Sequence, residues 1–457
     1  MPQFLRLIPP DDARVRMLSH LSNPSSSDQT EVEKNFEFVD SAISIGRVTG
    51  EDIVAPHSLP EFPRSTVDGY AVRASATFGA TDSLPAYLTL IGEILMGEAP
   101  LFELKSDQCL LIHTGGMLPK GADAVLMLEH TQEILLSRDE EHNEGEKGIT
   151  IERRRLTGNR EIEILRPVAE GENVIFIGED VAEGNIVIPK GRRIRPSEVG
   201  GLIALGILSL RVAKKPRVGI ISSGDEIVDP IVHTRIGQVR DVNSYTLSAL
   251  VTKSGGEPVL YGIVPDQLTR LKEVSTKALS ECDMVVITAG SSTSTRDMTA
   301  EVIGSLGHPG VLVHGINTRP GKPTILGVCS GKAVIGLPGN PVSALVNGYL
   351  FVVPVIEKLL GMPYDAATGS TRHPSVPAKL TVNLPSQAGR EDWWPVKITS
   401  VPSAVDHGHE FIGNWQAEPI FGKSNLIFTL VAADGLLRIP PEVTGVSAGE
   451  EVEVILF

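Results

Sequence analysis

Between residues 215 and 362, short apolar runs alternate with stretches of helical periodicity, and this alternation constrains the fold more than any other feature of the sequence. The apolar runs include "RVGIISS", "PVLYGIV", "DMVVITA" and "KAVIGLP", and helix-like stretches such as "NSYTLSALVTKSGG" lie between them. Strands that alternate with helices indicate a parallel sheet with helices on both faces. We therefore predict a doubly wound α/β domain over residues 215–362.

Four polar, glycine-containing stretches mark places where strands of this domain are expected to end. They are residues 222–226 (SSGDE), 288–297 (TAGSSTSTRD), 319–323 (RPGKP) and 338–341 (PGNP). In an open parallel sheet, ligands bind outside the carboxyl ends of the strands. We expect all four stretches to lie at one end of one sheet, where they would form a ligand site.

The charges in these stretches are of both signs. Four carboxylates could hold a hard cation such as Mg²⁺, which prefers carboxylates together with phosphate oxygens: Asp225, Glu226, Asp266 and Asp297. Arg319, Lys322 and the backbone N–H groups after Pro341 could hold anions. A phosphate-bearing substrate with Mg²⁺ would satisfy both signs. A purely structural interpretation is also open, because Gly-Asp-Glu after a strand forms turns and caps, and Lys322 alone could be a solvated lysine.

Two further regions of the chain are predicted to be rich in β-structure. Residues 60–129 carry short Val, Ile and Leu runs punctuated by glycine. Residues 363–457 alternate through "KLTVNL", "WWPVKITSV", "SNLIFTLVAADGLLRI" and "EEVEVILF", a pattern typical of a small β domain. A chain of 457 residues is too long for one ordinary core, so we expect several domains.

Shorter features predict local structure between these regions. The charge-rich residues 130–172 are typical of a solvated loop or hairpin. A helix is expected to start near Ser197, which would be its N-cap after Pro196. In "STVDGYAV", Asp68-Gly69 is a candidate hairpin turn.

Charge, cysteine content and apolar length argue against several classes of protein. The formal net charge of −15 argues against nucleic-acid binding, because phosphate backbones attract a basic surface. The three cysteines are scattered without a CxxC motif, which fits a reducing cytosol. No signal peptide opens the chain, and the longest apolar stretch, residues 344–356, is too short to span a bilayer. We therefore expect a cytoplasmic protein with no membrane contact. No P-loop, HExxH or Cys/His zinc motif occurs.

Seven stretches taken together resemble one enzyme family. They are "STVDGYAV", "CLLIHTGGMLPKGADAVLMLEHT", "NVIFIGEDV", "SSGDEIV", "GQVRDVNSYTLSALV", "RPGKPTILG" and "GLPGNPVSALV", in that order. The sequence is similar to the molybdopterin molybdenumtransferases, which insert molybdate during synthesis of the molybdenum cofactor, and to the E domain of gephyrin. The resemblance covers roughly residues 35–457.

This resemblance implies an architecture and a reaction. The expected domains are an elongated discontinuous domain (residues 1–58 and 173–214), an inserted β domain (59–172), the α/β domain (215–362) and a C-terminal β barrel (363–457). The resemblance also implies a homodimer whose active site lies between the α/β domain of one subunit and the inserted domain of the other. The implied reaction joins molybdate to adenylylated molybdopterin, depends on Mg²⁺ and releases AMP. The molybdopterin adenylyltransferase is a candidate partner.

The resemblance also assigns roles to residues of this sequence. The catalytic group would be Asp68, Thr114, Asp180, Glu226 and Asp266. The substrate-binding group would be Ser222, Gly224, Gly290, Ser292, Pro320, Gly339 and Asn340. The group that binds molybdate or another oxyanion would be Arg319, Lys322, Ser343, Arg390 and Ser424. The metal would be held by Asp225, Glu226 and Asp297. The helix that starts after Asn340 would receive an oxyanion at its N-terminus.

Three stretches depart from the family pattern. Many relatives carry Gly-Gly-Val-Ser-Val-Gly where this chain has residues 289–294 (AGSSTS), and the glycine lost at Ser291 could change how closely the pterin approaches. Several relatives carry a lysine just before "RPGKP", where this chain has residues 314–317 (HGIN) and thus fewer cations. The charged residues 137–161 form a longer insertion than usual. Molybdate and tungstate have the same charge and nearly the same size, so the sequence does not separate them.

Two other functions fit parts of the sequence. Adenylylation of molybdopterin needs only the α/β part, so the additional domains argue against it, and ATP consumption would discriminate. A scaffold role like that of gephyrin is disfavoured because the sequence shows no second catalytic module and no long disordered linker.

Overall fold

A computed structural model describes residues 7–21, 35–101, 103–135, 160–289, 293–370, 373–400 and 415–457. The chain divides into two compact units. The first comprises Met1–Glu51, Lys190–Ile203 and Ile207–Phe457, and the second comprises Asp52–Pro189 and Ala204–Gly206. Each unit is described by itself.

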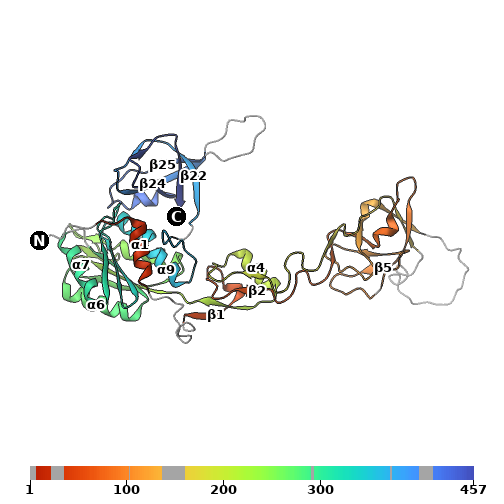
Figure 1. The fold of residues 1–457 in the computed structure, drawn as a ribbon, viewed down its shortest axis with the longest axis horizontal. Coiled ribbons are helices and arrows are strands. Elements are labelled where there is room, and N and C mark those ends of the chain that lie inside the picture. Colours follow the sequence, from red (N-terminus) through yellow and green to blue (C-terminus); the bar gives the residue numbers. More distant parts are fainter. Residues whose placement is uncertain are drawn as a thin grey trace, which may run out of the picture. The chain divides into compact units, whose positions relative to one another are not determined.

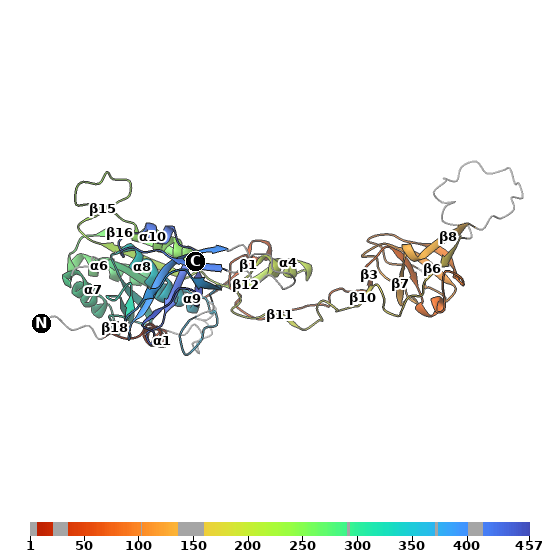
Figure 2. The ribbon, with the colours of Figure 1, turned by 90° about the horizontal axis from the view of Figure 1, so that it is seen from above.

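A six-stranded sheet forms the centre of the first unit (Figures 1 and 2). Its order is β16 (Glu257–Val264), β13 (Arg217–Ser223), β17 (Met284–Ala289), β21 (Lys332–Pro338), β20 (Ile325–Cys329) and β18 (Pro309–His314). The first four strands are parallel. The expectation of a wholly parallel sheet is wrong for β20, which is antiparallel to both its neighbours.

The reversal at β20 has a local cause in the sequence. Only Ser330 and Gly331 connect β20 to β21, and both have positive φ angles of 52° and 79°. Such a two-residue turn joins antiparallel strands, whereas parallel strands need a long crossover.

Helices cover both faces of this sheet, which confirms the doubly wound α/β fold. One apolar cluster joins Val218, Ile220 and Val286 to α1 (Pro10–Ser19), α5 (Asn243–Lys253), α8 (Pro341–Asn347) and α9 (Val353–Leu359). A second cluster joins the alternate strand residues Ile221, Val285 and Ile287 to α6 (Leu268–Glu281) and α7 (Thr293–Ser305). Alternate side chains of a strand point to opposite faces, so the two helix groups lie on opposite sides of the sheet (Figure 1).

The helical stretch from α8 through a π-helical turn (Gly348–Val352) to α9 is apolar all round. Among the described residues, this stretch is the one helix with the length and composition of a membrane span, and 83% of its most apolar window is buried inside the protein. It is a core helix of the α/β domain.

A closed five-stranded barrel follows the α/β domain (Figure 1). Its strands are β24 (Glu391–Ser400), β25 (Trp415–Pro419), β22 (Ser375–Leu380), β28 (Glu451–Leu456) and β26 (Gly435–Ile439), and pairing of β24 with β26 closes the ring. β19 (Thr318–Arg319), which belongs to the loop after β18, pairs in parallel with the start of β24. The α/β domain and the barrel therefore share a strand pairing.

Two local predictions are wrong. The stretch "SNLIFTLVAADGLLRI" is not one strand, because α10 (Phe428–Val431) precedes β26. Within α10 only Leu430 is buried, while Phe428 and Val431 are exposed. Ser197 is not an N-cap, because α4 (Pro196–Ala204) already begins at Pro196, a residue that is favoured in the first position of a helix. The Ser197 hydroxyl donates to Glu198 at 3.0 Å.

The second unit is built on a six-stranded sheet. Its order is β7 (Ala124–Met127), β4 (Gly69–Val72), β6 (Gln108–Ile112), β5 (Ala86–Ile94), β9 (Arg160–Ile164) and β8 (Thr131–Leu135). Apolar side chains form a cluster on each face. β8 and β9 pair antiparallel, and most of the charged insertion between them, residues 136–159, lies outside the described residues.

Short ribbons complete the two units. In the first unit, β1 (Phe36–Asp40) pairs with β12 (Ser209–Ala213). In the second unit, β2 (Ile53–Val54) pairs with β11 (Ile186–Ile188), and β3 (Arg64–Ser65) pairs with β10 (Val174–Ile175). Each ribbon joins residues that are more than one hundred positions apart in the sequence.

Candidate functional site

The described parts of the four polar stretches lie at one end of the α/β sheet, as the sequence predicts. β13 ends at Ser223, β17 at Ala289 and β21 at Pro338, and the three strands are parallel. The 319–323 stretch lies between the end of β18 and the start of β20. Because Ile325 pairs with both His314 and Gly336, this loop belongs to the same end of the sheet.

A cavity of about 660 Å³ lies between this end of the sheet and the barrel, within the first unit. All five residues predicted for the oxyanion line it, and so do Pro320 and Asn340 of the substrate-binding group. The five are Arg319, Lys322, Ser343, Arg390 and Ser424. We call this space the oxyanion cavity. The structure thus brings together residues that lie more than one hundred positions apart in the sequence.

The wall contributed by the RPGKP loop is fixed to α8. Gly321 has φ +102°, and a Cβ at this position would overlap the side-chain amide of Asn347. That amide donates to the carbonyl oxygens of Pro320 at 3.2 Å and Ser343 at 2.8 Å. Glycine is therefore needed here for the loop to approach the helix.

The start of α8 is bonded to the barrel as well as facing the cavity. The Val342 N–H donates to the Ser424 carbonyl at 3.0 Å, and the Asn340 side chain donates to the Ser424 hydroxyl at 3.1 Å. Val342 is therefore not free to bind an anion, contrary to what we expected of the N–H groups after Pro341.

The charge of the oxyanion cavity is positive. Arg319 lies over the Trp394 ring, 5.2 Å from its centre. Lys322 and Lys423 form no salt bridge with any described residue. Arg390 is paired with Asp392, the one acidic residue in the lining. Four cations against one carboxylate favour an anionic ligand.

A second polar group lies at the ends of β13 and β16. The Ser223 hydroxyl donates to Asp266 at 2.7 Å, and the Asp266 N–H donates to Asp225 at 3.2 Å. Asp225 and Glu226 are exposed. These contacts link two of the four carboxylates considered for Mg²⁺, Asp225 and Asp266, and Glu226 is next to Asp225 in the sequence.

Other predicted substrate-binding and metal residues lie at the same end of the sheet. The Ser222 hydroxyl pairs with that of Thr288 at 3.2 Å, and Gly224 follows β13. The Gly339 carbonyl accepts from Asn243 at 2.8 Å. Asp297 is exposed in the first turns of α7. Gly290, Ser291 and Ser292 lie outside the described residues.

The described acidic residues do not form a complete metal site by themselves. Among the described residues, no three His, Cys, Asp or Glu side chains lie close enough to hold a metal ion by themselves. Mg²⁺ is commonly held by one or two carboxylates together with substrate phosphates and water, so the predicted metal ligands Asp225, Glu226 and Asp297 would need further oxygens from the substrate. Binding of Mg²⁺ to these residues remains a prediction.

The second unit holds Asp68 and Thr114 in direct contact. Asp68 Oδ1 accepts from the Thr114 N–H at 2.7 Å and from its hydroxyl at 3.1 Å. These bonds, helped by the nearby His113, hold the pKa of the exposed Asp68 carboxyl below its usual value. Asp68-Gly69 is not a hairpin turn, because β3 pairs with β10 while β4 pairs with β6 and β7.

His113 and Glu93 extend this cluster and were not predicted. His113 Nε2 lies 2.8 Å from Glu93, and its Nδ1 lies 3.8 Å from Asp68. Asp180 lies apart in the loop after β10, where its N–H donates to the Leu59 carbonyl at 3.1 Å. The Asp180 side chain is exposed, and among the described residues no hydrogen bond joins it to Asp68 or Thr114.

Comparisons with known proteins agree on one family. The chain matches the MoeA N-terminal region (domain I and II) over residues 8–206, a probable molybdopterin binding domain over 219–358, and the MoeA C-terminal region (domain IV) over 377–457. It is 34% identical to a putative molybdopterin biosynthesis protein of Methanocaldococcus jannaschii, covering 94% of both chains. It is 30% identical to the molybdopterin molybdenumtransferase of Haemophilus influenzae, covering 98% of both chains.

A solved structure gives the same result. The molybdopterin biosynthesis moeA protein of Pyrococcus horikoshii OT3 is 32% identical, with a TM-score of 0.77 over 99% of this chain and 100% of that chain.

Proposed function

Because this chain belongs to the molybdopterin molybdenumtransferase (MoeA) family, we propose that it inserts molybdate into adenylylated molybdopterin and releases AMP. The observation that carries this proposal is the oxyanion cavity, whose lining brings all five predicted oxyanion residues to one place. The division into four domains at residues 59, 173, 215 and 363 remains a prediction.

The oxyanion cavity provides what a tetrahedral metal oxyanion needs. Arg319 and Lys322 supply charge from the RPGKP loop, and Arg390 supplies a planar donor group from the barrel. The hydroxyls of Ser343 and Ser424 can donate to further oxygens. Binding in this cavity would hold molybdate beside the part of the site that receives the pterin.

The ends of β13 and β16 would receive the phosphate-bearing part of the substrate. Ser222 and Gly224 present small side chains at the strand end, and Asp266 is oriented by Ser223. If Mg²⁺ is bound by Asp225, Glu226 and Asp297, it would neutralise negative charge on the phosphoanhydride.

A second copy of the chain would complete the site. Asp68 and Thr114 belong to the second unit, and Asp68 is held ionised by its hydrogen bonds. A carboxylate of lowered pKa can orient an attacking water or accept its proton. We propose a homodimer in which Asp68, Thr114 and Asp180 of a second copy face the oxyanion cavity. The enzyme would act in the cytoplasm, and the adenylyltransferase that supplies its substrate would be its partner.

Reconstitution tests this proposal directly. The purified chain is mixed with adenylylated molybdopterin and Mg²⁺, and AMP release is followed with and without molybdate. Molybdate-dependent AMP release is expected, and tungstate in place of molybdate tests oxyanion preference. AMP release that does not depend on either oxyanion, or ATP consumption with molybdopterin, would contradict the transferase assignment. Sedimentation of the same protein tests the dimer.

A further inference from the structure

One pair of side chains in the oxyanion cavity is organised differently from the rest. Arg390 Nε donates to Asp392 Oδ1 at 2.7 Å and Nη2 donates to Oδ2 at 3.0 Å. Only 1% of the Asp392 side chain is exposed, against 27% for Arg390. The anion that enters the cavity therefore meets the arginine, and the carboxylate stands behind it.

The carboxylate itself is held in place from several directions. The Ser386 hydroxyl donates to Asp392 Oδ2 at 3.0 Å. The Asp392 backbone belongs to β24 and pairs in register with Arg319 of β19 and with Ile439 of β26. A residue fixed on both sides of its strand and at its side chain has little freedom to move.

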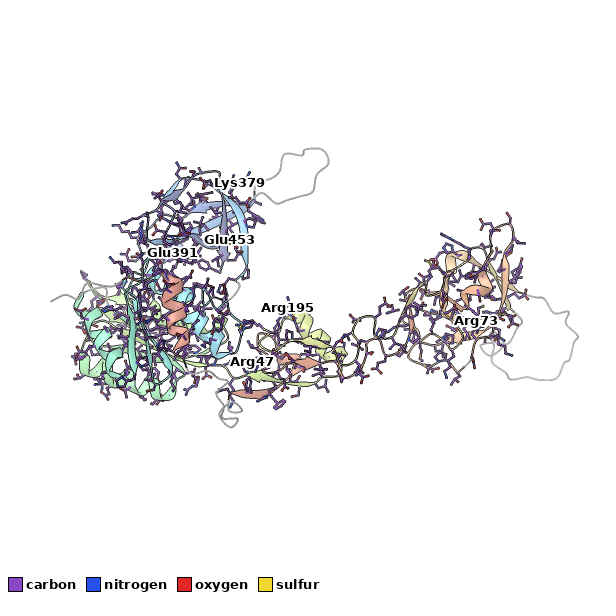
Figure 3. All side chains as sticks on the ribbon, viewed as in Figure 1. Arg47, Arg73, Arg195, Lys379, Glu391 and Glu453 are labelled. Carbon is purple, nitrogen blue, oxygen red and sulfur yellow. The ribbon has the colours of Figure 1, made fainter. Side chains whose placement is uncertain are left out.

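On the same face of β24, the ring of Trp394 packs against the second arginine, Arg319. Asp392 and Trp394 are two positions apart, so their side chains project to the same side of the strand, and both line the oxyanion cavity. Trp394 supports Arg319, and Asp392 supports Arg390. The alternate residues of the strand, Glu391 and Trp393, are joined by a hydrogen bond that the Trp393 ring N–H donates to Glu391 at 2.7 Å. Figure 3 labels Glu391 at the start of β24, close to the α/β domain.

The geometry of the guanidinium group determines which of its N–H groups remain available to a ligand. Arginine has five N–H donors in a rigid fork. Asp392 uses the edge formed by Nε and Nη2, which leaves the terminal edge formed by Nη1 and Nη2 for a second partner. Along that edge, among the described residues, Nη1 makes only a 3.4 Å contact with Gln387.

We propose that Asp392 is a positioning residue that orients Arg390, so that the terminal edge of its guanidinium binds the oxyanion. This inference rests on the proposed function of the oxyanion cavity. It assigns a carboxylate, which by charge alone repels anions, a favourable role in binding them.

Replacing Asp392 with asparagine distinguishes two possible effects of this carboxylate, because they change the affinity for anions in opposite directions. If Asp392 acts only as a nearby negative charge, its removal strengthens anion binding. If it positions Arg390, its removal weakens binding. We expect Asp392→Asn to raise the dissociation constant for molybdate by about tenfold, the loss typical when a group that orients a ligand-binding residue is removed. Titration calorimetry with molybdate alone, and then with tungstate alone, measures this.

A double-mutant cycle shows whether the effect passes through Arg390. We expect Asp392→Asn to have little further effect when Arg390→Ala is already present, because residues that act through one another are not additive. Additive losses, or tighter binding by Asp392→Asn, would overturn the proposal. Glu451→Gln, at an exposed carboxylate of β28, is the matched control and should bind molybdate like the wild type.

Two further measurements keep the test decisive. If thermal unfolding shows that Asp392→Asn does not fold, Asp392→Glu retains the charge and displaces the carboxylate by roughly 1.5 Å, one carbon–carbon bond. Unchanged molybdate affinity in that variant would equally overturn the positioning role. A wild-type protein that binds neither molybdate nor tungstate would instead refute the proposed function itself, so the two failures are distinguishable.

Discussion

Asp68 and Thr114 are joined by two hydrogen bonds to the same carboxylate oxygen, one from the Thr114 N–H and one from its hydroxyl. The two residues are 46 positions apart in the sequence, at the start of β4 and directly after β6 and His113. A carboxylate that accepts two donors in this way is both oriented and kept ionised. The remaining lone pairs of Asp68 stay exposed at the surface of the second unit.

Replacing Asp68 with alanine should abolish turnover without unfolding the protein. The carboxylate is exposed and belongs to no turn, so its loss costs little packing, whereas an acid–base group contributes about 100-fold or more to a rate. AMP release and thermal unfolding of Asp68→Ala measure the two effects. Asp82→Ala, at an exposed carboxylate in a turn of the same unit, is the control. Activity close to that of the wild type would remove Asp68 from the site.

Replacing Thr114 with valine should move the acidic limb of the pH–activity profile to higher pH. The Thr114 hydroxyl is one of the two donors that lower the Asp68 pKa, and valine keeps the shape but cannot donate. Asp68 would then become protonated earlier as the pH falls, and activity that requires its ionised form would be lost earlier. AMP release measured from acidic to neutral pH tests this. A limb that stays in place or moves to lower pH contradicts it.

Replacing Asp297 with asparagine should raise the Mg²⁺ concentration that gives half-maximal AMP release, by roughly tenfold if the carboxylate is a ligand. Glu301→Gln is a matched control, because Glu301 is also an exposed acid of α7, four residues further on. Dimerisation should be unaffected in both variants. Identical Mg²⁺ titrations for the two variants would exclude Asp297 from the metal ligands.

Replacing Gly321 with alanine should destabilise the first unit by about 2 kcal/mol or more, because a positive φ and an overlap act together. The new Cβ would overlap the Asn347 amide that holds the RPGKP loop to α8. Gly361→Ala measures the cost of the positive φ angle alone, since Gly361 has φ +75° and nothing within 4 Å of its Cβ position. Urea unfolding of both variants gives the comparison. Equal losses would mean that contact with Asn347 is not required.

Replacing Glu391 with alanine should cost about 2 kcal/mol of unfolding free energy, because it leaves the N–H of the buried Trp393 ring without this partner and opens space at a buried position. Glu391 is 2% exposed and accepts from Arg438 at 2.6 and 2.9 Å and from Trp393 at 2.7 Å. Glu453→Ala, at an exposed barrel carboxylate labelled in Figure 3, should cost less than about 0.5 kcal/mol. Similar losses for both would show that the Glu391 cluster is not stabilising.

The pH dependence of this cluster has a definite sign. Burial raises the Glu391 pKa, although Arg438 opposes the shift. A carboxyl whose pKa is higher in the folded protein contributes stability below its ordinary pKa, and this contribution is lost as the pH rises through the raised value. The Glu391→Gln variant has no titrating carboxyl at this position. As the pH rises from the ordinary pKa of glutamate through the raised value, the unfolding free energy of the wild type should therefore fall relative to that of Glu391→Gln.

The α/β core and the position of the site were predictable because both depend on local sequence pattern. Apolar runs that end in glycine and charge identified β13, β17 and β21, and the strand-end rule placed their turns together. The direction of β20 was not predicted, because a short apolar run looks the same in either direction. Ser330-Gly331, a two-residue connection between two apolar runs, was the signal that could have indicated the hairpin.

The residues that support the oxyanion cavity were not predicted, and their contacts explain why. Asp392 and Trp394 act on arginines brought to them by strand pairing and barrel closure, which no local pattern encodes. His113 lies next to Thr114 in the sequence, but its contacts with Glu93 and Asp68 depend on how the strands of the second unit pair. The family resemblance therefore pointed to residues expected to bind ligand, but not to the residues that orient them.

The packing of α1 has a consequence for the order in which the chain can fold during synthesis. α1 packs into a core formed by β18, β20 and the helices around Phe351, so its partners emerge from the ribosome about three hundred residues later. At about 5 to 20 residues per second, this delay is roughly 15 to 60 seconds. α1 is thus translated well before these native neighbours, and until they emerge its apolar side, including Met17 and Leu18, lacks the contacts that bury it in the folded protein.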